Sequence, residues 1–185
     1  MDNTTQKIFI DLKSSDDKIR LIALQSALNI TENKVNWVYE VWGDLIDKLD
    51  NENSYQRSIG IMLLCNLAKS DAEKRIQKDL KTILKHTKDD KFITSRQCLQ
   101  NIWKIASACI ETKEPIIKHL KMRFTECSAE KHSNLLRLDI IQSIYKLYRV
   151  SGDKKLIEIM TNLIEEEKEE KYRKQYKASI AELVK

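Results

Sequence analysis

One arginine recurs at nearly regular intervals through this chain of 185 residues. The intervals are 37, 39, 41 and 36 residues. Repetition at such a period is typical of proteins built from stacked copies of one small helical or mixed unit, so it excludes most other architectures. The recurring residues are Arg20, Arg57, Arg96, Arg137 and Arg173.

Apolar or small residues follow each arginine at offsets of 3, 7 and 10. Because an α-helix has 3.6 residues per turn, these offsets lie on one face, so each repeat is predicted to contain a helix that buries the same face. Offset 3 holds Ala23, Gly60, Leu99, Ile140 and Tyr176; offset 7 holds Ala27, Leu64, Trp103, Ile144 and Ile180; offset 10 holds Ile30, Leu67, Ala106, Leu147 and Leu183.

A second amphipathic stretch precedes each of these helices. The predicted ranges are about 5–13, 35–49, 72–86, a helix beginning near Pro115, and 154–165. Pro115 is placed in a first helical turn, where proline is well tolerated. Short polar segments at 14–17, 50–54 and 88–90 supply Ser, Asp and Asn as N-caps. Residues 165–170 contain no helix breaker, so whether the last two helices are separate stays open.

The composition supports an all-α fold. The chain has 3 Gly and 1 Pro, against roughly 13 and 9 at average usage. So few turn formers make a β-rich fold improbable. The sequence therefore predicts one domain, 1–185, of about five two-helix repeats with approximate ranges 1–33, 34–70, 71–111, 112–151 and 152–185.

The segment 16–28 resembles the second helix of a HEAT repeat, with Asp16, the aliphatic Ile19, then Arg20 and small and apolar residues at helical spacing. Later repeats keep the arginine but replace the aspartate. This resemblance implies a right-handed α-solenoid in which the second helices line a concave surface. It also implies that the arginines are structural and join neighbouring turns, although a phosphate-binding ladder is the alternative.

Partner contacts are then expected on the helix face opposite the apolar stripe. This face is rich in amides and mildly basic, which favours binding of another protein or peptide over DNA, since DNA would require more Lys and Arg. A merely solvated face is an equal alternative. The candidate partner-binding residues are Gln25, Met62, Lys69, Asn101, Lys104, Gln142, Tyr145 and Arg149.

Nucleic acid is the second choice of partner. The alternative function is DNA binding or repair resembling the HEAT-like alkylpurine DNA glycosylases, which need aromatic residues and an acid on the concave surface. The aromatic and acidic candidates are Trp37, Trp42 and Asp44, which are not spaced as in that family. Trp103 is predicted to lie in the core.

No enzyme is predicted. The three histidines lack zinc-site spacing, the isolated glycines form no phosphate loop, and no cofactor or metal is expected. The four cysteines are predicted to be free, buried thiols in a reducing compartment. No apolar stretch reaches the length of a membrane span. We therefore expect a cytoplasmic protein without membrane contact, either a monomer or a weak homodimer.

Overall fold

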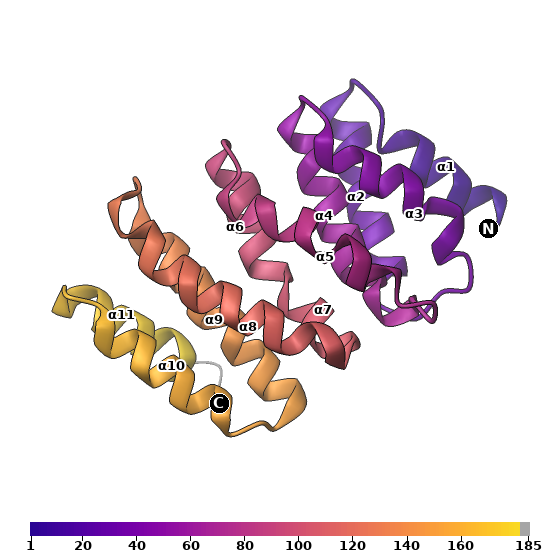
Figure 1. The fold of residues 1–185 in the computed structure, drawn as a ribbon. Helices are drawn as coiled ribbons and strands as arrows, with labels where there is room; N and C mark the ends of the chain where they lie inside the picture. Colours follow the sequence, from indigo (N-terminus) through magenta and orange to yellow (C-terminus); the bar gives the residue numbers. More distant parts are fainter. Residues whose placement is uncertain (182–185) are drawn as a thin grey trace.

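The computed structural model describes residues 1–181, and these residues form helices joined by short turns, without a strand in that range. The all-α fold is therefore confirmed. Figure 1 shows the helices arranged in one row that runs from the N-terminal to the C-terminal part of the chain. The α-helices are α1 Asn3–Asp11, α2 Asp17–Ile30, α3 Val38–Asp47, α4 Ser54–Leu67, α5 Arg75–Lys85, α6 Phe92–Asn101, α7 Trp103–Ala108, α8 Ile110–Glu126, α9 Ser133–Ser151, α10 Lys155–Glu166 and α11 Glu170–Ala181; the 3₁₀ turns are η1 Lys48–Asp50, η2 Ala68–Ser70, η3 His86–Lys88 and η4 Cys127–Ala129.

The helices pack in successive pairs. α1 packs on α2, α3 on α4, α8 on α9 and α10 on α11, while α5 adjoins α6 through η3. The second helix of each pair also contacts the second helix of the next one, in the order α2, α4, α6, α9 and α11. The helices that carry the recurrent arginines therefore lie next to one another along the row (Figure 1).

The predicted apolar stripe forms much of the core. All five residues at offset 3 are buried, as are Ala27, Leu64 and Ile144 at offset 7 and Leu67, Ala106 and Leu147 at offset 10. Ile30 and Ile180 are half-buried at the two ends of the row, and Leu183 lies outside the described residues. Burial of this stripe on neighbouring helices is the main stabilising contribution, because one pair alone leaves it in water.

Short polar side chains begin several helices, as the sequence predicts. Asp16 Oδ1 accepts hydrogen bonds from the backbone amides of Lys18 and Ile19 at 2.8 and 3.2 Å. Asn53 Oδ1 accepts from the Tyr55 amide at 2.9 Å. Each side chain satisfies amides in a first turn that have no partner within the helix.

The helix predicted around Arg96 is interrupted. α6 ends at Asn101, and the next hydrogen bond, from the Ile105 amide to the Ile102 carbonyl, spans three residues rather than four. Ile102 and Ile105, on either side of the interruption, are fully buried. Trp103 packs against the core, as predicted, but its side chain is only half-buried.

The helix predicted to begin near Pro115 begins earlier. α8 starts at Ile110, directly after the extended residue Cys109, so Pro115 lies inside the helix rather than in its first turn. The proline cannot donate to the carbonyl of Glu111. Glu111 is exposed, so water can satisfy that carbonyl and the helix continues.

The last two helices are separate. Their break contains Glu167, whose side chain is buried although it belongs to an acidic run. Its carboxylate accepts hydrogen bonds from Arg137 Nη1 at 2.8 Å, Tyr176 Oη at 3.2 Å and the Glu169 amide at 3.1 Å. Burial opposes ionisation, but these bonds outweigh it and lower the pKa of Glu167. The buried Glu167 carboxylate, with its three donors, therefore holds the turn between α10 and α11, which would be absent if the two formed one continuous helix.

Candidate functional site

Two adjoining grooves lie on the face formed by the second helices of the first four pairs. The first groove, of about 670 Å³, crosses α2, α4, α7 and the end of α9, and we call it the Lys104 groove. The second groove, of about 320 Å³, crosses the first halves of α2, α4 and α6, and we call it the apolar groove. Met62 lines both, so they form one continuous surface. The Lys104 groove is lined by Leu28, Glu32, Lys34, Met62, Asn66, Lys69, Asn101, Trp103, Lys104, Ser107, Ala108 and Val150.

A half-buried ammonium group lies in the Lys104 groove. Lys104 Nζ donates to Asn66 Oδ1 at 2.8 Å and to Asn101 Oδ1 at 2.7 Å. Asn66 is itself buried, and its Nδ2 donates to Thr31 Oγ1 at 3.1 Å and to the Leu28 carbonyl at 3.3 Å. The asparagine orientation is therefore fixed by α2, and it directs an acceptor at the lysine.

Burial lowers the pKa of Lys104, and the positive charges of Lys146 and Lys69 lower it further. Lys69 is exposed and donates to the Glu32 carbonyl at 2.8 Å. The groove lining carries the three lysines Lys34, Lys69 and Lys104 and the single carboxylate of Glu32. The surface is therefore positive, and it suits an anionic group of modest size.

Trp103 lines the same groove. Its indole Nε1 is buried and has no hydrogen-bond partner among the described residues. A buried unpartnered donor is unusual in a folded protein. Trp103 is the first residue of α7, directly after the interruption.

The apolar groove carries large exposed side chains. Leu21 is 55% exposed, Tyr55 64% and Ile93 62%. The guanidinium carbon of Arg20 lies 5.2 Å from the centre of the Tyr55 ring, a cation–π contact that orients the ring. Large apolar side chains that gather on one surface are typical of binding sites, so the apolar groove is a candidate for binding.

The structure brings four of the eight predicted partner-binding residues together. Met62, Lys69, Asn101 and Lys104 all line the Lys104 groove. The other four lie elsewhere: Gln25 is exposed on α2, Gln142 is half-buried on α9, and Arg149 is exposed near the end of α9, while Tyr145 is buried.

Tyr145 corrects one expectation. It is 4% exposed and packs against Tyr148, with ring centres 6.0 Å apart, so it presents no surface to a partner. Offset 8 borders the apolar stripe, and the neighbouring helices cover it on α9 as they cover Cys65 on α4. Sequence reasoning missed Leu21, Tyr55 and Ile93 as groove residues, although their size at positions outside the stripe was a usable signal.

The recurrent arginines at the two ends of the row hold backbone carbonyl groups. Arg20 Nη1 donates to the Ser14 carbonyl at 2.7 Å, and the same guanidinium pairs with Asp17. Arg173 Nη1 donates to the Glu167 carbonyl at 3.1 Å. These contacts tie each helix to the turn that precedes it.

The three recurrent arginines in the middle of the row connect neighbouring helix pairs. Arg57 on α4 binds Asp89 beside η3, and Arg96 on α6 binds Asp139 on α9 with Nε and Nη2 at 2.6 and 2.9 Å. Arg137 on α9 binds Glu167, as described above. Two parallel bonds from an arginine fork to a carboxylate restrict both distance and orientation. Carboxylates within the chain therefore engage these groups, which leaves them little capacity for phosphate.

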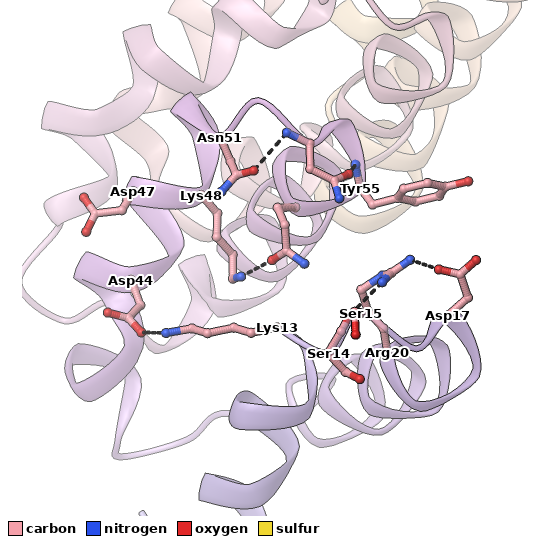
Figure 2. Close-up of a pocket in the computed structure, with 12 residues that line it drawn as sticks. Lys13, Ser14, Ser15, Asp17, Arg20, Asp44, Asp47, Lys48, Asn51 and Tyr55 are labelled. Atoms are coloured by element: carbon pink, nitrogen blue, oxygen red, sulfur yellow. Dashed lines mark hydrogen bonds and ion pairs between the residues drawn. The ribbon is translucent and has the colours of Figure 1, made fainter.

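A polar pocket of about 710 Å³ lies at the turns of the first two pairs (Figure 2). Lys13 reaches across it to Asp44 at 2.9 Å, and Lys48 donates to Gln56. The Tyr55 ring points away from Lys48, toward the apolar groove (Figure 2). The lining of this pocket matches its three cations with the carboxylates of Asp17, Asp44 and Asp47, so it has no excess of positive charge and is the weaker candidate for binding.

The aromatic residues considered for nucleic-acid chemistry do not meet on a surface. Trp37 and Trp42 are 9% and 3% exposed, so neither can stack on a nucleotide. Trp42 Nε1 donates to Asp79 on α5 at 2.8 Å, and Trp37 packs edge-on against Phe9. Asp44 is exposed and paired with Lys13, which lowers the pKa of its carboxyl.

The remaining reactive residues show no shared site. All four cysteines are free and buried. Within residues 1–181, no group of three His, Cys, Asp or Glu side chains could hold a metal ion. In the same range, no helix is long and apolar enough to cross a membrane.

Comparison with known proteins gives a likeness of fold. A crystal structure of an engineered protein is similar to this chain, with a TM-score of 0.58 and 14% sequence identity over 88% of this chain and 68% of the engineered one. At this identity the likeness concerns the fold alone. No family model matches the sequence, and neither does any curated protein.

Proposed function

We propose that the chain is a HEAT-like, right-handed α-solenoid of five repeats whose concave face, formed by the second helices, binds another protein without catalysis. The observation that carries the proposal is the continuous surface of the Lys104 groove and the apolar groove. The second helices of the first four pairs contribute to this surface. It combines exposed apolar side chains with positive charge that no carboxylate neutralises. We would not expect a surface that only faces water to expose Leu21, Tyr55 and Ile93 side by side.

The internal pairing of the arginines supports the solenoid. Arg57, Arg96 and Arg137 each bind a carboxylate of the next helix pair, as expected when similar units are stacked. Such an arrangement presents one extended face, to which each repeat adds a few side chains. The chemistry of that face, rather than a reactive centre, then determines the function.

Affinity capture from a lysate of the source cells, compared between matched variants, tests the proposal. Ile93→Asp places a charge in the apolar groove, and Met122→Asp places the same charge on α8, where Met122 is 51% exposed. We expect a protein that the unmodified chain and Met122→Asp retain and Ile93→Asp loses. Retention of nucleic acid alone, equal for all three chains, would favour the DNA-binding alternative instead.

A further inference from the structure

Lys104 has no carboxylate partner, unlike Lys113 and Arg96, two other partly buried cations of the chain. Lys113 pairs with Asp153 at 2.6 Å, and Arg96 pairs with Asp139. No ion pair involves Lys104 in the part of the chain that the structure describes; its partners are the amide oxygens of Asn66 and Asn101. The positive charge is oriented but not neutralised.

This arrangement leaves one position for an anion. An ammonium group has three donors, and the two asparagines accept two of them. Nearby Cys65 does not supply a counter-charge, because burial raises the pKa of its thiol to about 12. Partial burial of an unpaired charge is unfavourable, so a carboxylate arriving from outside would gain both an ion pair and relief of that cost.

The apolar groove provides the second half of the surface. It begins at Met62, which also lines the Lys104 groove, and it extends over α2, α4 and α6 to Leu21 and Ile93. A large aliphatic or aromatic side chain entering there would remove these exposed residues from water. The two grooves thus offer a basic position and an apolar position to one bound segment.

We infer that the two grooves together bind a single acidic and apolar peptide segment of the partner, with its carboxylate on Lys104 and a large apolar side chain in the apolar groove. This inference rests on the proposed function and names the chemistry of the partner. Charge complementarity supports it, since Lys34, Lys69 and Lys104 face the single carboxylate of Glu32 in the lining. Salt should weaken this binding, because part of the attraction is electrostatic.

Selection of random short peptides displayed on phage against the purified full chain provides the test. We expect enriched peptides to carry Asp or Glu near a large apolar residue. The affinity of an enriched peptide is then measured by fluorescence polarisation on the unmodified chain, Lys104→Met, Ile93→Ser and the matched control Lys118→Met, which changes an exposed lysine on α8.

Lys104→Met and Ile93→Ser should each weaken binding about tenfold or more, whereas Lys118→Met should leave it unchanged. Changing the peptide's acid to its amide should weaken binding to the unmodified chain about as much, and should have little further effect on Lys104→Met. The comparison of acid and amide peptides on the unmodified chain needs no protein variant, so it holds even where a variant folds poorly.

The outcomes separate the two proposals. Peptides that depend on Ile93 but not on Lys104 or on an acid would overturn the inference and leave the proposed function standing. Selection of no peptide, or of peptides insensitive to both groove variants, would overturn the inference; it would overturn the proposed function as well only if affinity capture also retained no protein that Ile93→Asp loses. Stronger binding of a labelled DNA oligonucleotide than of any peptide, lost in Lys104→Met, would overturn both in favour of nucleic acid.

Discussion

Arg57 and Asp89 form a bidentate ion pair, with Nε and Nη2 of the guanidinium 2.8 and 2.6 Å from the two carboxylate oxygens. The same guanidinium donates from Nη1 to the carbonyls of Asn51 and Glu52 at 2.9 and 3.0 Å. One side chain therefore holds its own preceding turn and the turn of the next pair at a fixed separation. The side chain of Asp89 is only 3% exposed, so water cannot replace the arginine.

Replacing Arg57 should lower the stability of the fold. Arg57→Met leaves the Asp89 carboxylate buried with fewer donors, and we expect it to lower the free energy of unfolding by about 3 kcal/mol. Urea unfolding at neutral pH measures the change as a shifted midpoint at unchanged slope. Lys7→Met is the control, because it removes an exposed pair with Asp11 and should change stability by less than about 0.5 kcal/mol. Equal, small effects of both variants would show that the Arg57 contacts contribute nothing.

Stability should also fall in acid through Asp89. Burial alone would raise the pKa of its carboxyl, but hydrogen bonds from Arg57, His86 and the Lys91 amide hold that pKa well below the ordinary value of 3.8. A carboxyl whose pKa is lower in the folded state stabilises the fold above the unfolded value and loses this contribution as pH falls through the folded one.

The difference in unfolding free energy between the unmodified chain and Asp89→Asn measures that contribution. It should be largest at pH 7 and should shrink progressively below about pH 4. A difference that stays constant from pH 7 to about pH 2 would mean that ionisation of Asp89 plays no part. Urea unfolding curves of the two proteins, recorded at several pH values, supply these free energies.

The two helical glycines should respond in opposite directions to alanine. A Cβ on Gly60 would lie 2.8 Å from the Leu45 carbonyl oxygen and 3.1 Å from Lys48 Cβ, so it would force α3 and α4 apart. We expect Gly60→Ala to destabilise by about 1–3 kcal/mol despite the better helix propensity of alanine. Gly43 has no atom within 4 Å of such a Cβ, so Gly43→Ala should stabilise by about 0.5–1 kcal/mol. Thermal unfolding followed by circular dichroism compares the two, and stabilisation by both would contradict the close approach at Gly60.

The thiols should be unreactive in the folded protein. Burial raises the pKa values of Cys65, Cys98 and Cys127, so little thiolate is present at pH 8 and none of the three is accessible. We expect Ellman's reagent to label them only at the rate of unfolding, and all cysteines to react at once in denaturant. Rapid reaction of any of these three thiols without denaturant would contradict their burial.

The sequence predicted the helices and the buried stripe because both depend on local periodicity. It could not predict the interruption at Ile102, since the hydrogen bond that marks it leaves no special residue type in the sequence. Trp103, directly after this residue, packs against the core and also lines the Lys104 groove. A periodic pattern of apolar residues does not reveal a single irregular turn within a helix.

The groove itself was predicted in part. Met62, Lys69, Asn101 and Lys104 were found because offsets opposite a buried stripe face outward on a regular helix. Tyr145 was misplaced because exposure at the margin of the stripe depends on which neighbouring helix covers it. The sequence analysis did not predict any buried charge. Arg123 on α8 is 1% exposed and donates to Glu130 and to the Thr87 carbonyl. In the sequence it looks like any other arginine on the polar side of a helix.

The acidic run at residues 165–170 looks like a set of interchangeable charges, but the structure makes one of them unique. Glu167 is buried and holds Arg137 and Tyr176, whereas Glu166 and Glu170 face water. In a saturation mutagenesis experiment that selects for folded protein, this segment should therefore show a single intolerant position among permissive neighbours. A composition-based method that treats the run as a low-complexity linker would discard the residue on which the docking of the last helix pair depends.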